Sequence, residues 1–594
     1  MKYKRILPAL GLALLLASPS WAQLTRRISV SSGGTQGNDA SATPSISADG
    51  LSVAFMSAAT NFVAGDTNDS LDVFCRNLLD SQTEIGSVGS SGLGNDYSQG
   101  AAISADGNFV AFDSTATNLV AGDTNGDSDV FVRSRLLGTT QRVSISSSGA
   151  EGDNSSFVAT ISADGRFVAF ASNATNLVTG DTNGVTDIFL RDRLSGVTER
   201  ISVSDAEAQG NGTSSSPSLS GDGRYVAFVS DATNLVSGDT NTWRDIFVRD
   251  RLSGVTVRAS VSSQEGQANG HSSLPSISAD GRFVAFTSAA TGLIGPLAFD
   301  TNGVDDVFCR DLVNGSTGRV SISSTAQGNG ASSSPSISAD GRFVAFASSA
   351  SNLVTGDTNS KTDVFVHDRS TVTTERVSLG SGGTQGNLSS FDPSISGDGR
   401  FVAFFSDATN LVSGDTNNAG DIFLRDRNTP GFTSLCDPGV GGVHACPCGN
   451  PPSAAGRGCN NSSGTGGAYL TASGMAYLST DSLVFTTYAQ RPTALSILLQ
   501  GNAPAAGVVF GQGVRCAGGS LKRLFVKSAS SGSITAPGAG DPSVSARSAA
   551  KGDTIQAGQS RWYLAYYRDP NVLGGCPATS GFNATQTGRV DWRP

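Results

Sequence analysis

The sequence predicts an all-β protein in which a seven-bladed β-propeller is followed by a smaller, disulfide-braced β-sandwich. Three observations support this prediction. A Ser-Ala/Gly-Asp-Gly turn recurs seven times, at spacings of 57, 58, 58, 58, 60 and 58 residues. Each repeat contains four short strand-like segments. Six of the eight cysteines lie in the last 160 residues, after the repeats have ended.

The first 22 residues predict a secretory signal peptide. Lys2, Lys4 and Arg5 provide a positive start, "ILPALGLALLLA" is apolar, and "SPSWA" places small residues before a cut after Ala22. We therefore expect a secreted or periplasmic protein. No integral membrane segment is expected after cleavage, because the chain has no second long apolar run.

Residues 23–434 are assigned to the propeller, and residues 159–204 illustrate one repeat. "ATIS" is short and apolar, "RFVAFAS" and "DIFLRDR" read as the next two strands, and "TERISVS" is the fourth. Asp-Gly and Ser-Gly turns, together with an Asp-Thr-Asn loop, separate the strands. Four antiparallel strands repeated seven times predict propeller blades, and the absence of a helical period excludes a helical solenoid.

The two ends of the repeat array predict that it closes on itself. The seventh repeat stops after its third strand, while "LTRRISVSSGGTQGN" at 24–38 matches "TTERVSLGSGGTQGN" at 373–387. We therefore expect the segment behind the signal peptide to supply the fourth strand of the last blade, which removes the open sheet edges.

The repeat "SISADGRFVAFASSASNLVTGDTN…TDVFVHDR…TTERVS" resembles the TolB-type, WD40-like (PD40) propeller repeat, over roughly residues 24–434. The resemblance implies a propeller fold. It leaves the function open, since such propellers serve as binding platforms and also as accessory domains of peptidases and lyases.

The Asp-Thr-Asn loops raise the question of a metal. Hard oxygens on each loop suit Ca²⁺, but three side chains fall short of the about six to eight ligands that it takes. The favoured interpretation is that Asp and Asn accept backbone N–H groups in turns. No cofactor is then required, and calcium is the alternative. The candidate ligands are Asp66, Asn68, Asp72, Asp123, Asn125, Asp129, Asp181, Asn183, Asp187, Asp239, Asn241, Asp245, Asp300, Asn302, Asp306, Asp357, Asn359, Asp363, Asp415, Asn417 and Asp421.

Departures from the repeat mark a candidate ligand site. We expect the Asp-Thr-Asn loops and the loops that lead to the next blade to share one face. Three neighbouring loops on that face carry an aromatic residue, bases and an apolar insert, which suit a protein or glycan ligand. The alternative is neutral drift in surface loops. The residues are Trp243, Arg244, His271, Leu297 and Phe299.

The C-terminal region opens with a Gly/Ser/Cys-rich segment at 435–466 and continues with strand-like runs over 467–594. An even number of cysteines in an exported domain favours disulfides over a metal site. The predicted disulfide cysteines are Cys436, Cys446, Cys448, Cys459, Cys516 and Cys576. "CPCGN", "GC.NS" and "YYRDP" make the region similar to a module on secreted proteins of environmental bacteria. Cys75 and Cys309 are expected to be buried free thiols.

The composition narrows the function. A net charge of −10 argues against a nucleic-acid partner and against an anionic membrane surface. No serine-hydrolase, zinc-protease or phosphate-loop motif is found. The sequence therefore favours an exported, non-catalytic binding or scaffold protein. The alternatives are a propeller-type carbohydrate-active enzyme, either a lyase or a glycosidase, and a calcium-stabilised adhesion module.

Overall fold

The computed structural model divides into two compact units, the first ending at Arg427 and the second beginning at Asn428. The predicted signal peptide lies outside the described residues. In the part of the chain that is described, no helix has the length and apolar character to cross a membrane. The structure describes residues 24–594 except 91, 295–299, 325, 428–432, 437, 439–442, 448, 454–456, 474, 475, 477, 479, 480, 482, 539, 557, 572–580, 593 and 594.

The described residues of the first unit form seven four-stranded antiparallel sheets, which we number as repeats 1 to 7. Repeat 1 has β2 (Ser41–Ile46), β3 (Ser52–Ser57), β4 (Asp72–Asn77) and β5 (Thr83–Ile85); repeat 2 has β8 (Ser98–Ile103), β9 (Phe109–Ser114), β10 (Asp129–Ser134) and β11 (Thr139–Arg142). Repeat 3 has β12 (Ser156–Ile161), β13 (Phe167–Ser172), β14 (Asp187–Asp192) and β15 (Val197–Arg200); repeat 4 has β16 (Ser214–Leu219), β17 (Tyr225–Ser230), β18 (Asp245–Asp250) and β19 (Val255–Arg258). Repeat 5 has β20 (Ser272–Ile277), β21 (Phe283–Ser288), β22 (Asp306–Asp311) and β23 (Ser316–Arg319); repeat 6 has β24 (Ser332–Ile337), β25 (Phe343–Ser348), β26 (Asp363–Asp368) and β27 (Thr373–Arg376). Repeat 7 has β28 (Ser390–Ile395), β29 (Phe401–Ser406), β30 (Asp421–Asp426) and β1 (Leu24–Arg27), and a two-stranded hairpin of β6 (Val88–Gly89) and β7 (Gly92–Leu93) follows repeat 1.

The N-terminal strand pairs where the sequence comparison placed it. β1 runs antiparallel to β30, with Arg27 opposite Phe423. The pairing continues past the strand, because the Ile28 N–H donates to the Ile422 carbonyl at 2.7 Å. The first and last repeat segments of the chain therefore share one sheet.

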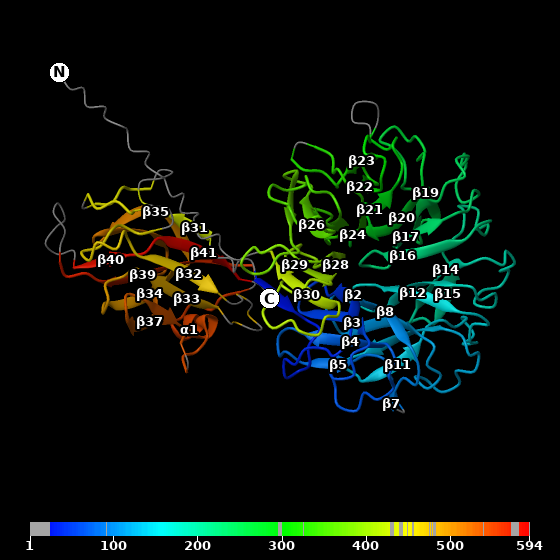
Figure 1. Ribbon diagram of the computed structural model, residues 1–594, viewed down its shortest axis with the longest axis horizontal. Helices are drawn as coiled ribbons and strands as arrows, with labels where there is room; N and C mark the ends of the chain where they lie inside the picture. Colours follow the sequence, from blue (N-terminus) through cyan, green and yellow to red (C-terminus); the bar gives the residue numbers. More distant parts are fainter. Residues whose placement is uncertain are drawn as a thin grey trace, which may run out of the picture. The chain divides into compact units, whose positions relative to one another are not determined.

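Neighbouring sheets contact one another in a cycle. The first strand of each sheet lies beside the first strand of the next, and β28 lies beside β2. Figure 1 shows β2, β8, β12, β16, β24 and β28 around the middle of the unit, with β5, β11, β15, β19 and β23 toward its rim. A ring of backbone N–H to carbonyl hydrogen bonds joins the Asp-Gly turns. Its members are Asp49 to Ala105, Ala105 to Ala163, Ala163 to Gly221, Gly221 to Ala279, Ala279 to Ala339, Ala339 to Gly397 and Gly397 to Ala48.

The Ser-Ala/Gly-Asp-Gly motif forms these turns through its side chains. In repeat 3, Asp164 Oδ1 accepts from Ser162 Oγ at 2.7 Å, and the Phe167 N–H donates to Ser162 Oγ at 2.9 Å. Gly165 has a φ of +73°, and a Cβ there would lie 2.1 Å from the Phe109 ring of repeat 2. The glycine is therefore required both by the turn and by the close approach of the preceding sheet.

The core of the first unit follows the period-2 pattern of the second and third strands. Phe170 of β13 stacks on Phe189 of β14, with ring centroids 6.2 Å apart, and both side chains are fully buried. They pack against Val130 and Val132 of the preceding sheet. The alternate residues Ala169, Ile188 and Leu190 pack against the following sheet, so this sheet is buried on both faces.

The second unit is also mainly β. Its six-stranded sheet has β31 (Thr433–Cys436), β41 (Thr587–Asp591), β39 (Ser560–Arg568), β34 (Leu495–Gly501) and β37 (Lys522–Ser528), with β40 (Phe582–Ala584) paired to β39. A three-stranded sheet has β32 (Tyr469–Ser473), β33 (Val484–Tyr488) and β38 (Ile534–Ala536), and a hairpin has β35 (Ala503–Phe510) and β36 (Gly513–Gly518). The helix α1 (Val544–Ala550) was not predicted from the sequence. Because β31 pairs with β41, residues 433 and 434 belong to this unit and not to the repeats.

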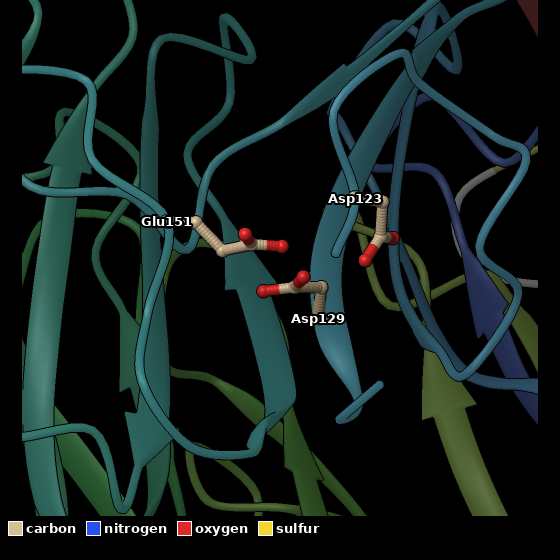
Figure 2. Close-up of side chains that lie close together, drawn as sticks. All are labelled: Asp123, Asp129 and Glu151. Atoms are coloured by element: carbon tan, nitrogen blue, oxygen red, sulfur yellow. The ribbon is translucent and has the colours of Figure 1, made fainter. Parts of the chain in front are cut away.

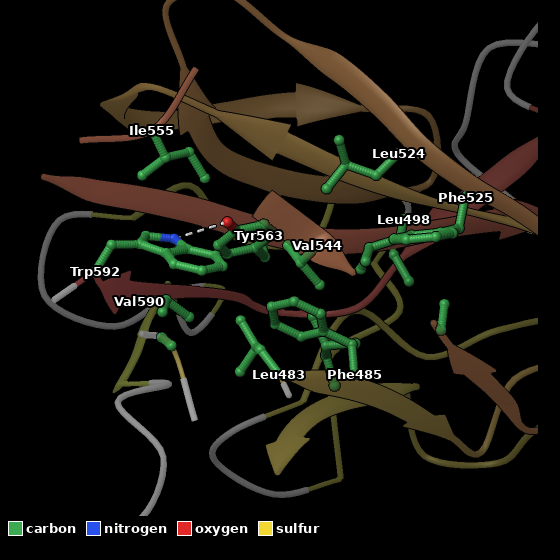
Figure 3. Close-up of a cluster of buried hydrophobic side chains, with 14 residues drawn as sticks. Leu483, Phe485, Leu498, Leu524, Phe525, Val544, Ile555, Tyr563, Val590 and Trp592 are labelled. Carbon is green, nitrogen blue, oxygen red and sulfur yellow. Dashed lines mark hydrogen bonds between the residues drawn. The ribbon is translucent and has the colours of Figure 1, made fainter. Parts of the chain in front are cut away.

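Side chains from the two larger sheets meet in one core, shown in Figure 3. Phe485 of β33 packs on Tyr563 of β39, with ring centroids 4.6 Å apart, and Trp592 Nε1 donates to the Tyr563 hydroxyl at 3.1 Å. Tyr563 and Tyr567 are fully buried, whereas Trp562 and Tyr566 are half-buried. The alternation along β39 therefore places half of these aromatic residues in the core.

The cysteines behave as expected where the structure describes them. Cys446 and Cys459 form a disulfide, and Cys516 is also disulfide-bonded. The side chains of Cys436, Cys448 and Cys576, which were also predicted to form disulfides, lie outside the described residues. Cys75 and Cys309 are free and buried, and burial raises the pKa of each thiol to about 12.

Candidate functional site

The seven Asp-Thr-Asn loops join the second strand to the third strand of each sheet. In repeat 3, Asn183 Nδ2 donates to Asp187 Oδ2 at 2.8 Å and to the Gly210 carbonyl at 3.0 Å. The Val185 N–H donates to Asn183 Oδ1 at 3.3 Å. The asparagine therefore builds a turn and ties it to the loop that leads into repeat 4, as the turn interpretation predicted. We call the end of the first unit that carries these loops the loop face.

An arginine from the fourth strand lies between the two aspartates of most loops. In repeat 3, Arg200 Nη1 is 3.1 Å from Asp181 Oδ1 and 3.5 Å from Asp187 Oδ2. The guanidinium thus supplies the positive charge that a metal ion would otherwise bring. The equivalent pairs are Arg27 with Asp415 and Asp421, Arg142 with Asp123 and Asp129, Arg258 with Asp239 and Asp245, Arg319 with Asp306, and Arg376 with Asp357 and Asp363.

Among the described residues, three carboxylates come close together in repeat 2. Figure 2 shows the carboxylates of Asp123, Asp129 and Glu151 converging. Arg142 Nη1 lies among them, 3.5 Å from Asp123, 2.9 Å from Asp129 and 2.6 Å from Glu151. Burial raises the pKa of Asp123 to about 6. Because the guanidinium occupies the point where the three carboxylates meet, we propose no metal ion in this repeat.

Repeat 1 keeps the acids but has no arginine at the position of Arg200. Asp66, Asn68 and Asp72 occupy the same loop positions, and Asn68 Nδ2 donates to Asp72 Oδ2 at 2.9 Å. Ile85 stands where Arg200 stands in repeat 3, since the two residues are opposite Phe74 and Phe189 in the same strand register. This loop therefore differs chemically from the other six.

The structure brings together three of the five residues predicted to bind a ligand. The rings of Trp243 and His271 meet edge to face, with centroids 4.7 Å apart, and the Arg244 N–H donates to His271 Nδ1 at 3.1 Å. Arg244 Nε lies 3.3 Å from Asp231 Oδ1. Trp243 is 41% exposed. Leu297 and Phe299, the other two, lie outside the described residues.

Asp113 is a carboxyl group that the sequence analysis overlooked. It is 2% exposed, and burial raises its pKa to about 6. Gln99 Nε2 and the Val158 N–H donate to it at 3.1 and 3.2 Å. The available signal was "FVAFDS" in repeat 2, where repeat 3 has "FVAFAS".

Comparisons with known proteins give matches of low similarity. No family model matches the chain, and no curated protein matches it. A putative TolB from Agrobacterium tumefaciens is 19% identical, with 47% of this chain and 80% of that chain covered and a TM-score of 0.30. An oligogalacturonate lyase in complex with manganese is 12% identical over 68% and 92%, with a TM-score of 0.40. An acylaminoacyl peptidase from Pyrococcus horikoshii is 11% identical over 62% and 49%, with a TM-score of 0.38. Likenesses of this strength say nothing about activity.

Proposed function

We propose that the first unit is a closed seven-bladed β-propeller in an exported protein, secreted or periplasmic, and that its loop face binds a protein or glycan ligand without catalysing a reaction. The antiparallel pairing of β1 with β30 and the cyclic contacts between sheets support the closed propeller. The arginines between the repeated aspartates support a non-catalytic role, because they hold these carboxylates in ion pairs.

The observation that carries the binding proposal is the exposed Trp243. Its indole is held edge to face by His271, so little conformational entropy is lost when a ligand covers the ring. The exposed ion pair of Arg244 and Asp231 lies beside it and offers charged donors and acceptors. An aromatic ring flanked by polar groups suits the apolar face and hydroxyls of a sugar, or a peptide side chain and its backbone.

A binding experiment on the full-length protein tests this proposal. We expect binding to a glycan or peptide array, and a loss of about tenfold or more in affinity for Trp243→Val, because an exposed tryptophan is a typical centre of binding energy. Valine is the residue that repeat 3 has at this position, Val185, so the variant keeps the loop of a natural repeat. The affinity is measured by calorimetry with the array hit.

Leu194→Ala provides the matched control. Leu194 is 80% exposed and lies in the turn between β14 and β15, at the strand ends opposite the loop face. This variant should bind with unchanged affinity. Wild-type affinity in Trp243→Val, or an array without any hit, would contradict the proposal.

The carbohydrate-active enzyme is the second candidate, and Asp113 is the observation that favours it. A glycosidase needs two carboxyl groups placed across the scissile bond. Asp113 has the raised pKa of an acid catalyst, and most repeats have an apolar residue at this strand position. Both carboxylate oxygens of Asp113 already accept a hydrogen bond, one from Gln99 and one from Val158. We therefore rank the enzyme function below binding.

A further inference from the structure

The Asp-Thr-Asn loop of repeat 1 lacks two polar side chains, an arginine and a glutamine, that contact the equivalent loop of repeat 3. Ile85 replaces the arginine, as the strand register shows. Leu93 replaces the glutamine, because it pairs with Val88 as Gln209 pairs with Val203 in repeat 3. Neither replacement can carry charge or accept a hydrogen bond through its side chain.

The two carboxyl groups of this loop are nevertheless buried. Asp72 is fully buried, and its Oδ1 and Oδ2 accept from Ser87 Oγ at 2.5 Å and Asn68 Nδ2 at 2.9 Å. Asp66 is only 8% exposed, and its Oδ1 has no hydrogen-bond partner among the described residues. In repeat 4 the equivalent oxygen, Asp239 Oδ1, also has no hydrogen-bond partner in the described part of the chain, but it forms an ion pair with Arg258 at 2.8 Å. Asp66 has no such ion pair among the described residues.

A buried pair of carboxylates without a counter-ion is costly, because each charge loses its hydration. Among the described residues no side chain supplies a positive charge to Asp66 or Asp72, since Ile85 stands at the position of the arginine. A water molecule could fill the space but could not neutralise the charge.

A backbone oxygen adds to the set of potential ligands. In repeats 2, 3 and 7 the arginine also donates to the carbonyl of the glycine before the first aspartate, at 2.9 Å for Gly122, 3.3 Å for Gly180 and 3.2 Å for Gly414. Gly65 is the equivalent residue of repeat 1. Its carbonyl and the two carboxylates are all hard oxygen donors, which suit Ca²⁺ rather than zinc or copper.

We propose that repeat 1 binds one Ca²⁺ ion through Asp66, Asp72 and the Gly65 carbonyl, at the position that a guanidinium occupies in the other six repeats. Water completes the coordination sphere of about six to eight oxygens. The occupant is a small ion rather than an arginine of a partner protein, because the aspartates are too deeply buried for a second chain to reach. With two carboxylates and one carbonyl, we expect a dissociation constant on the order of 10⁻⁴–10⁻³ M.

Calorimetric titration of the EDTA-stripped, full-length protein with CaCl₂ tests this inference. We expect one bound Ca²⁺ per chain and a higher melting temperature in calcium than in EDTA. Asp66→Asn should abolish the binding heat, because it removes one of the two charges. Ile85→Arg should abolish it as well and should raise the melting temperature in EDTA, because the guanidinium then balances the carboxylates as it does in repeat 3.

Two controls keep the result unambiguous. Asp181→Asn changes the equivalent acid of repeat 3 and should leave calcium binding intact, since that acid already pairs with Arg200. Ile85→Met changes the same position without adding a charge and should also bind. Absence of binding in the wild type, or unchanged binding in both Asp66→Asn and Ile85→Arg, overturns the inference. Trp243→Val should bind calcium normally, so the ligand proposal and the calcium proposal fail separately.

Discussion

Deletion of residues 24–31 from the full chain is expected to unfold its first unit. The deletion removes β1, which leaves one edge of β30 unpaired. It also removes Arg27 and Ser29, two of the side chains that bind the buried carboxylate of Asp421. Leaving a buried charge without its partner costs about 3–5 kcal/mol by itself, and whole domains are stable by only about 5–15 kcal/mol. The loss is measured by calorimetric unfolding and size-exclusion chromatography.

A permuted chain separates the loss of the strand from the loss of its sequence position. The segment 24–36 is moved to follow Arg427 through a copy of residues 194–196, which is the order in which repeats 1 to 6 supply their fourth strand. This chain should recover the melting transition of the wild type. The account of β1 is wrong if the deleted chain melts like the wild type, or if the permuted chain melts no better than the deleted one.

The second large effect is expected from Arg376→Ile. Arg376 is 8% exposed, and its Nη1 lies 2.9 Å from Asp357 Oδ1 and 3.0 Å from Asp363 Oδ2. Isoleucine leaves both buried carboxyl groups without a positive charge, which should lower the free energy of unfolding by about 3–5 kcal/mol. The variant also gives repeat 6 the residue that repeat 1 has naturally, Ile85. Urea unfolding in EDTA measures the difference.

Arg342→Ile is the matched control from the same repeat. The side chain of Arg342 is 46% exposed and pairs with Asp368 at 2.7 Å. Asp368 is buried, but it also accepts hydrogen bonds from the N–H and hydroxyl of Ser370 at 2.9 and 2.7 Å. Because these bonds remain and the lost guanidinium is in contact with water, this variant should lose clearly less stability than Arg376→Ile. Equal losses in the two variants would show that the arginines between the loop aspartates have no special role. If repeat 1 binds calcium as inferred, Arg376→Ile should also gain a calcium-dependent rise in stability.

Most strands of the first unit could be predicted because local pattern and repetition agree. "RFVAFAS" and "DIFLRDR" alternate as strands, and each recurs at a fixed distance from an Asp-Gly turn. The match between residues 24–38 and 373–387 was sufficient to place β1. The contact of Trp243 with His271 followed from the expectation that the two loops share one face.

The start of the first strand could not be placed from its composition. "ATIS" predicted a strand from residue 159, but β12 begins at Ser156. The register shifts between Phe157 and Thr160, and Val158 has a φ of 52°. A serine-rich start with a bulge has neither the alternation nor the β-branched run that indicates a strand.

The role of the arginines also required the structure. Asp181 and Arg200 lie 19 positions apart on different elements, so no local motif joins them. The calcium hypothesis therefore treated all seven loops alike. The signal that separates them was nevertheless present, because "TEI" ends the fourth strand of repeat 1 where repeat 3 has "TER". This sequence difference can be interpreted only once the strand register is known, because the register places residue 85 beside the loop aspartates.

Hydrogen–deuterium exchange of the full-length protein, followed for a peptide that covers residues 24–31, most directly tests closure of the repeat array by the N-terminal strand. If β1 completes the sheet of β30, the amides of this peptide should exchange as slowly as those of the equivalent segment 197–204 in repeat 3. Exchange at the rate of an unstructured peptide would contradict the closed arrangement.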